Sequence, residues 1–348
     1  MVLPILFIVI IIFGHGNDRF RSAFLFFLYT LAGSLPMLLS ILMIFSYVGS
    51  TDFQLIPDIS LDYQKILFIG FFIAFAVKTP LYPFIIWLPK AHADSPLAGS
   101  VILAATILKL ATYGYLRILI TMLPDATNYF SPLIQTIAVI TLIYSSLATI
   151  VQQDTKRLIA YSSIGHMAIV ILGLFSNTII GIEGAILLSI AHGLVSPALF
   201  TCVGGIIYDR THTRLIPQLR GLVTFMPMFT ILFFIFTLAN TGLPLTLNFL
   251  GEQMSLMGIF IRNPIVGVLG AFSILLSACY SLFLYNRISY GSYSPYLLNL
   301  KDINRREFYL LISLLIPTII LGIFPNVILD TLHMSVSGLL YDSSISYN

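Results

Sequence analysis

Long apolar runs alternate with short polar connections along the whole chain of 348 residues. A helix that crosses the hydrocarbon core of a membrane needs about 20 predominantly apolar residues. Ten runs stand out by this criterion, and the pattern predicts an all-α, polytopic membrane protein with about ten spans. The ten runs are residues 2–13, 22–48, 65–87, 96–122, 132–151, 157–175, 183–207, 222–261, 264–286 and 308–325.

Two of these runs do not have the length of a single membrane helix. The first, 2–13, would extend only about 18 Å, well short of a hydrocarbon core of roughly 30 Å. We therefore expect the chain to begin partway through a helix. The eighth, 222–261, is too long for one helix and is interrupted near Gly242 and Pro244. We expect it to cross the membrane once, as two half-helices.

The composition agrees with this interpretation. Hydrophobic residues make up 58% of the chain and charged residues 9%, whereas soluble domains carry about 25% charge. The formal net charge of +3 and the lack of a basic run exclude a nucleic-acid partner. Cys202 and Cys279 lie in apolar runs without a CxxC pair, so we interpret them as small core residues rather than metal ligands.

The charged residues of the connections predict an orientation. When the connections are numbered in order, the odd ones carry twelve of the seventeen lysines and arginines, and only three lie near the even ones. This alternation follows the positive-inside rule and supports the count of ten segments. The twelve residues are Arg19, Arg21, Lys90, Lys156, Arg157, Arg210, Arg214, Arg220, Arg287, Lys301, Arg305 and Arg306.

Three ionisable residues fall inside apolar runs instead. Lys78 and Lys109 lie centrally in the third and fourth runs, and Glu252 lies in the second half of the eighth. A charge at the centre of a bilayer costs about 2.5–3.5 kcal/mol on insertion scales. Such residues normally face a partner or a hydrated cavity, and they mark ion or proton pathways. Neither lysine is near enough to a helix end to reach the headgroups.

Four further polar residues allow weaker interpretations. His166 and His192 lie near the middle of the sixth and seventh runs. Each is either a proton relay or a neutral histidine held by a backbone carbonyl, and the sequence leaves both possibilities open. Glu183 and Arg117 lie toward segment ends, so we interpret the first as interfacial and the second as an anchor.

Prolines interrupt the third and eighth runs beside intramembrane charges. Pro80 and Pro83 follow Lys78 in "FAVKTPLYPF", and Pro244 precedes Glu252 in "LANTGLPLTLNF". A proline removes a backbone hydrogen bond, and membrane helices tolerate such breaks where they line a wet cavity. Matched broken helices in two halves of a chain are typical of inverted-repeat transporters. The alternative is a pair of ordinary proline kinks.

Five stretches together resemble one family. They are similar to the antiporter-like membrane subunits of NADH:quinone oxidoreductase, respiratory complex I, and within that family to the subunit 4 branch. The resemblance covers nearly the whole chain in order, and "LPKAHADSPLAGS" is its most specific block. The stretches are "VKTPLYPFIIWLPKAHADSPLAGSVILAATILKLATYGYLR", "LIAYSSIGHMAIV", "AHGLVSPALF", "RTHTR" and "LANTGLPLTLNFLGE".

The resemblance implies a fold and a set of roles. The family fold is an antiporter-like bundle of about fourteen helices with two inverted five-helix repeats, each holding one discontinuous helix. Residues 1–122 would be the remainder of the first repeat, 123–290 the second, and 291–348 a C-terminal helix and tail. A hydrated mid-membrane axis would contain Lys78 as the broken-helix lysine, Lys109 as the central lysine and Glu252 as the distal acid. His166 and His192 match the polar positions between the halves.

The resemblance also implies a function. The chain would be a subunit of the H+-translocating NADH:ubiquinone reductase, coupling electron transfer to proton pumping through this axis. It would have no redox centre; NADH, FMN, iron–sulfur clusters and ubiquinone would be bound by other subunits. Its partners would be lipids and the other membrane-arm subunits, especially antiporter-like subunits 2 and 5. Two alternatives are a multisubunit cation/proton antiporter, against which Glu252 in place of a lysine argues, and a structural remnant of the membrane arm.

One departure from the family pattern lies at the start of the chain. The glutamate that pairs with the Lys78-type lysine would fall immediately before Met1, together with four preceding helices. The sequence is then a fragment, starts late, or is completed by a second polypeptide. The Ile-, Phe-, Tyr- and Ser-rich composition with a single tryptophan, Trp87, indicates a mitochondrially encoded protein of the inner membrane. The lack of an import presequence before the first apolar run fits this interpretation.

Overall fold

The computed structural model describes residues 2–14, 18–53, 59–295, 297 and 300–345. Nearly all of this part is helical, and within it only an isolated bridge between Asp154 and Leu215 has β pairing. The elements are α1 Val2–Phe13, α2 Arg19–Val48, α3 Leu61–Lys78, α4 Trp87–Asp94, α5 Leu97–Ile102, η1 Leu103–Ile107, α6 Leu108–Gly114, η2 Tyr115–Ile120, α7 Pro124–Val151, α8 Thr155–Leu174, α9 Ile179–Phe200, η3 Thr201–Ile207, α10 Tyr208–Thr211, η4 Ile216–Gln218, η5 Leu222–Thr224, α11 Pro227–Asn240, α12 Leu247–Arg262, α13 Pro264–Ser289, α14 Arg305–Ile323 and α15 Asn326–Ile345.

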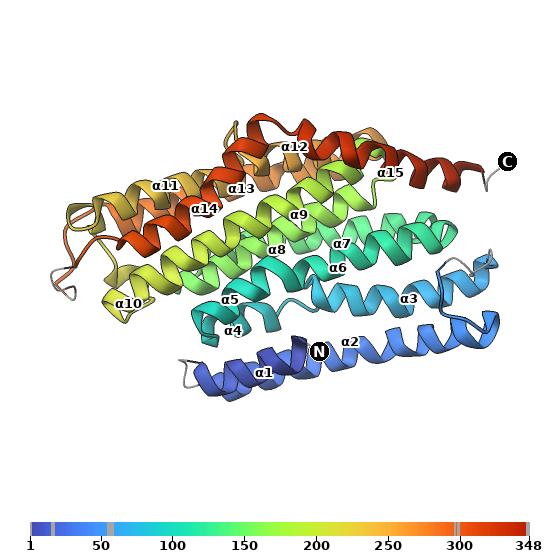
Figure 1. The fold of residues 1–348 in the computed structure, drawn as a ribbon, viewed down its shortest axis with the longest axis horizontal. Coiled ribbons are helices and arrows are strands. Elements are labelled where there is room, and N and C mark those ends of the chain that lie inside the picture. Colours follow the sequence, from blue (N-terminus) through green and yellow to red (C-terminus); the bar gives the residue numbers. More distant parts are fainter. Residues whose placement is uncertain (1, 15–17, 54–58, 296, 298–299, 346–348) are drawn as a thin grey trace.

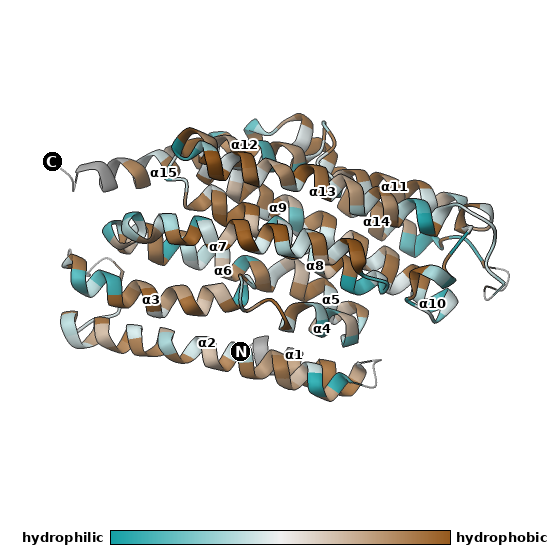
Figure 2. Ribbon diagram, turned by 180° about the vertical axis from the view of Figure 1, so that it is seen from behind, coloured by the Kyte–Doolittle hydropathy of each residue, from teal (hydrophilic) through white to brown (hydrophobic). Residues whose placement is uncertain are grey.

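The long helices lie roughly parallel to one another in a single bundle (Figure 1). Helices α1 and α2 form one edge, α3 and α4 come next, and α11 to α15 form the opposite edge, with α6 to α9 between them. Hydrophobic residues cover most of the helix lengths, whereas hydrophilic residues gather mainly at the two ends of the bundle (Figure 2). This distribution suits a protein whose sides face the hydrocarbon core of a membrane.

Seven of the ten predicted spans are confirmed as helices of membrane-spanning length. Seven helical stretches in the described residues are long and apolar enough to cross a membrane. They are α2, α5 through η2, α7, α8, α9 through α10, α13 and α14. The three remaining predicted runs correspond to the short helix α1 and to the broken pairs α3–α4 and α11–α12.

The two discontinuous helices are also confirmed. Helix α3 ends at Lys78 and α4 begins at Trp87, while α11 ends at Asn240 and α12 begins at Leu247. The pair α3–α4 runs in the opposite direction to α11–α12 along the bundle (Figure 1). This opposite direction is the relation expected of inverted repeats.

One residue assigned to a loop from the sequence is buried instead. Lys156 was counted among the loop charges, but its side chain is only 2% exposed and its ammonium donates to the Ser95 carbonyl at 2.9 Å. Its neighbour Arg157 is exposed, as expected of a loop charge. The interpretation was wrong for Lys156 because α8 begins at Thr155 and the first turn of α8 turns this side chain inward.

Glu183, interpreted as interfacial, lies near the start of α9, is 6% exposed and lies 2.8 Å from His333 Nδ1. Two smaller expectations need correction. Cys202 is a core residue as expected, but Cys279 is exposed on the side of the bundle. The C-terminal segment, expected as one helix and a tail, contains the two helices α14 and α15; residues 346–348 of that segment lie outside the described part.

Candidate functional site

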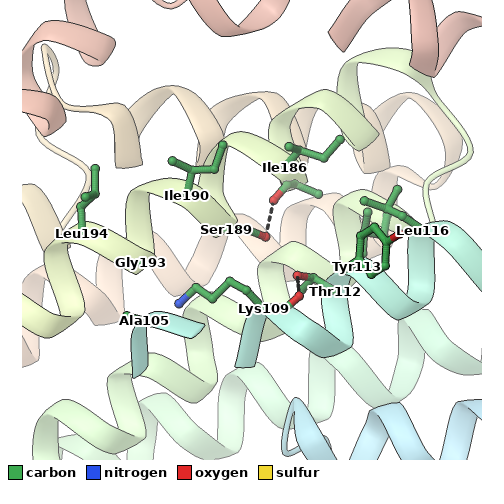
Figure 3. A pocket seen from close by; sticks show the side chains of 12 residues that line it. Ala105, Lys109, Thr112, Tyr113, Leu116, Ile186, Ser189, Ile190, Gly193 and Leu194 are labelled. Atoms are coloured by element: carbon green, nitrogen blue, oxygen red, sulfur yellow. Dashed lines mark hydrogen bonds between the residues drawn. The ribbon is translucent and has the colours of Figure 1, made fainter. Parts of the chain in front are cut away.

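Lys109 lies at the inner end of a cavity between the α5–η2 stretch and α9. Its ammonium donates to the Ala104 carbonyl at 2.6 Å and lies 2.6 Å from His192 Nδ1. Figure 3 shows the lysine side chain extended between Ala105 and Gly193. The π-helical turn η1 directly precedes this part of the helix and contains Ala104. Such turns are frequent at functional sites because they leave carbonyls free to accept other donors.

The cavity beside Lys109 has a volume of about 390 Å³ and is mostly apolar. Two of its polar side chains are bonded within their own helices: Thr112 donates to the Lys109 carbonyl and Ser189 to the Ala185 carbonyl. The lysine is therefore the only charged group lining it among the described residues.

A second buried pair lies beyond His192. The Nδ1 atom of His166, on α8, lies 2.9 Å from Glu252 Oε1. This distance is short enough for an ion pair, but the two atoms do not have the geometry of a hydrogen bond. The other ring nitrogen of His166 lies 3.1 Å from Asn240 Oδ1. Both ring nitrogens thus lie close to a side-chain oxygen atom. The rings of His166 and His192 have centroids 5.7 Å apart, so the two pairs are neighbours.

The second helix break positions Glu252. Gly242 has a φ of +75°, and a Cβ there would lie 2.9 Å from Glu252 Oε2. Glycine is therefore required both for the backbone conformation and for the space beside the carboxylate. Pro244 and Leu245 complete the turn, Leu245 with a φ of +78°. Glu252 itself is 3% exposed, in the second turn of α12.

The first helix break holds Lys78 apart from this group. Lys78 is the last residue of α3, and Pro80 and Pro83 lie in the non-helical stretch that follows. Its side chain is partly buried. Among the described residues, no hydrogen bond or ion pair joins it to Lys109 or to any carboxylate. Of the five predicted pathway residues, the structure thus brings together four and leaves Lys78 separate.

The backbone groups at the first break are satisfied by protein donors. The Ala76 carbonyl, which loses its partner at Pro80, accepts from the Leu81 amide at 2.9 Å. The Val77 carbonyl accepts from the Trp87 indole N–H, also at 2.9 Å. These two carbonyls therefore do not depend on water for a hydrogen-bond donor.

Three buried polar residues were missed by sequence reasoning. His92 is fully buried and stacks on Phe200 with ring centroids 4.4 Å apart. Asn248, one helical turn before Glu252, is fully buried as well. Neither side chain has a hydrogen-bond partner among the described residues, and buried polar groups of this kind are normally bonded to ordered water. Together with Lys156, they extend the set of polar residues inside the bundle. The signal in the sequence for His92 and Asn248 was a polar residue between two apolar ones, which Lys156 lacks.

Glycines bring the helices that carry His192 and Glu252 close together. A Cβ added to Gly251 of α12 would lie 2.6 Å from the Leu188 amide nitrogen of α9. A Cβ added to Gly184 of α9 would lie 2.5 Å from the Ser255 amide nitrogen of α12. Small residues at helix contacts let membrane helices approach closely and gain dispersion energy. The α9–α12 contact is therefore a rigid support for the site.

We predict that Gly251→Ala destabilises the protein, because the added methyl must displace backbone atoms of α9. Overpacking of this kind costs about 1–3 kcal/mol. The measurement is the midpoint of thermal inactivation of the assembled protein, which should fall. Gly338→Ala is the matched control, because nothing lies within 4 Å of a Cβ there; an equal effect of both substitutions would contradict the prediction.

Comparisons with known proteins place the chain in a family. Residues 1–277 match the family described as NADH:quinone oxidoreductase/Mrp antiporter, transmembrane. The NADH-ubiquinone oxidoreductase chain 4 of Mycosarcoma maydis is 61% identical over 99% of this chain and 71% of its own length. The chain 4 of Marchantia polymorpha is 49% identical over 97% of this chain and 69% of its own length.

A solved structure agrees with these sequence relatives. A chain in respiratory complex I from Thermus thermophilus with bound NADH superposes with a TM-score of 0.90 at 29% identity. The match covers 97% of this chain and 72% of that one. The chain therefore belongs to the NADH:quinone oxidoreductase/Mrp antiporter transmembrane family.

Proposed function

We propose that this chain is a proton-translocating subunit of the membrane arm of a respiratory NADH:ubiquinone oxidoreductase. The observation that carries the proposal is a series of neighbouring titratable side chains, from the partly buried Lys109 through the buried His192 and His166 to the buried Glu252. Charged and titratable groups in contact with each other inside a membrane protein are expensive, and they are typical of proton relays. The two chain 4 relatives support this membership of the complex.

The geometry suggests how the series handles a proton. The Lys109 ammonium faces His192 Nδ1, which can accept a proton while Nε2 carries another. At the other end of the series, His166 Nδ1 lies 2.9 Å from Glu252 Oε1, so the imidazole and the carboxylate face each other. The ring centroids of His166 and His192 lie 5.7 Å apart, and no hydrogen bond joins the two rings among the described residues.

The wider assignment follows the same reasoning. Lys78 at the first break would extend the pathway, with Pro80, Pro83 and Pro244 as the helix-breaking residues. Residues 1–122 and 123–290 would be the two repeat units, and 291–348 the C-terminal unit. The opposite directions of the two broken helices support this division.

The partners and location are part of the proposal. Antiporter-like subunits 2 and 5 would flank the chain in the membrane arm, and other subunits would bind NADH, FMN, iron–sulfur clusters and ubiquinone. The location would be the mitochondrial inner membrane. The exposed Arg157 and the loop containing Arg210 and Arg220 would face the matrix under the positive-inside rule.

Copurification separates this function from that of a multisubunit cation/proton antiporter, which the family description also includes. We expect the tagged chain, extracted in mild detergent, to copurify with flavin, iron–sulfur clusters and NADH:quinone activity. The absorption spectrum and the enzyme assay measure these directly. Recovery with membrane partners alone, and sodium-dependent proton exchange in vesicles, would support the antiporter instead.

A further inference from the structure

A second cavity lies at the end of the bundle where most of the positive charge gathers. It has a volume of about 430 Å³ and is formed by the C-terminal turns of α13 and by the connection between α10 and α11. The two segments are tied by a hydrogen bond from the Gly221 amide to the Tyr290 carbonyl, at 3.3 Å. Gly221 has a φ of +75°, and a Cβ there would lie 3.0 Å from Tyr293 Cα. This close approach holds Arg220 and Arg287 on the walls of one cavity.

Both arginines have guanidinium N–H groups available to donate to a ligand. Among the described residues, Arg220 donates only from Nε, to the Pro217 carbonyl at 3.2 Å. The Arg287 guanidinium lies over the Phe283 ring, 4.4 Å from its centroid. Neither forms an ion pair with any described residue, and no carboxylate lines the cavity. Arg210, by contrast, is paired to both oxygens of Glu307. Two unpaired guanidinium groups in one hollow favour a phosphate ligand, since their planar forks match its oxygens.

An apolar stripe leads from the cavity along α13. Phe283 is 47% exposed at the cavity, and Leu275 and Phe272 are 58% and 51% exposed further along the helix. With Cys279, these residues recur at helical spacings of three and four, so they share one face. Tyr290, 51% exposed, lines the cavity at the helix end, where tyrosines mark membrane interfaces. A soluble phosphate compound would make no use of this stripe, whereas the acyl chains of a lipid would cover it.

We propose that this cavity binds the headgroup phosphate of an anionic phospholipid, with Arg220 and Arg287 on the phosphate and the acyl chains along the exposed face of α13. Basic pockets between membrane helices on the positive side of a bundle are suited to such headgroups. The proposal does not depend on the proton-pumping role, because none of these residues contacts the Lys109–Glu252 series.

Photocrosslinking in the assembled complex tests the proposal. The complex is placed in vesicles of phosphatidylcholine that contain a photoactivatable phosphatidylglycerol, and crosslinked peptides are mapped. We expect labels on the peptides that contain residues 216–220 and 283–290. Each arginine near a membrane surface contributes about a fivefold preference for anionic lipid. Arg220→Gln and Arg287→Gln should each lower the yield about fivefold, and the double variant roughly thirtyfold.

Arg157→Gln is the matched control, because it removes an exposed charge at the same end of the bundle outside the cavity. Its labelling should equal that of the unaltered complex, and excess unlabelled phosphatidylglycerol should compete. Three results would overturn the proposal. The first is unchanged labelling in the double variant, and the second is competition by inorganic phosphate as strong as that by phosphatidylglycerol. The third is a crosslink between a neighbouring subunit and these same residues. The second would indicate a soluble anion site and the third a subunit interface.

Discussion

Lys109→Ala is expected to remove the contribution of this chain to proton translocation while leaving the complex assembled. The ammonium is the group that contacts His192, so its removal ends the series of contacts at the histidine. The side chain borders a cavity, and its truncation therefore disturbs little of the apolar packing around it. If, as proposed, other subunits bind the redox cofactors, NADH:quinone activity should fall only in proportion to the lost pumping. The ratio of protons translocated to electrons transferred, in reconstituted vesicles with a pH-sensitive dye, measures the effect.

Lys109→Arg gives a sharper version of this experiment. Arginine keeps the positive charge beside His192, but its guanidinium does not lose a proton in proteins. If Lys109 only supplies a charge, this variant should pump normally; if it carries protons, pumping should be low. A Lys109→Ala complex that assembles and pumps at the full ratio would remove the residue from the mechanism and favour a purely structural role for the chain.

Glu252→Gln is expected to have an effect of similar size. Glutamine has nearly the same shape, so the close contacts with Gly242 and the α9–α12 packing should survive. An amide cannot take up or release a proton as a carboxyl group can, so the side chain beside His166, 2.9 Å away, can no longer act as a proton carrier. We therefore expect the variant complex to assemble normally and to lose the contribution of this chain to proton pumping. The ratio of protons translocated to electrons transferred should fall, as for Lys109→Ala.

Glu183→Gln is the matched control for this substitution. Glu183 is also a buried carboxylate beside a histidine, His333, but it belongs to the α9–α15 contact and not to the Lys109–Glu252 series. Its replacement should lower thermal stability without changing the proton-to-electron ratio. Equal losses of pumping in both variants would indicate that any buried carboxylate is needed for assembly, and would contradict a specific role for Glu252.

The spans and their breaks could be predicted from the sequence because each depends on local properties. Whether a segment of about 20 residues enters a membrane depends on its own transfer free energy. A proline cannot donate a backbone hydrogen bond, so Pro80 and Pro244 mark candidate breaks. Proline alone does not decide where a helix breaks, because Pro36, Pro197 and Pro317 lie inside continuous helices. The resemblance of the motifs, rather than any physical derivation, supplied the roles expected of the intramembrane residues.

Only the tertiary structure decided which of these residues meet. Lys109 and His192 are 83 positions apart, and their contact depends on how α6 and α9 are packed. The burial of Lys156 and the separation of Lys78 from the other four pathway residues likewise depend on neighbouring helices. The mean hydropathy of a segment carries no information about which face each residue occupies. It therefore cannot distinguish a lysine that points into the bundle from one that reaches the membrane surface. Close contacts at residues such as Gly184 and Gly251 set the rotation and distance of α9 and α12, and with them the geometry of the site.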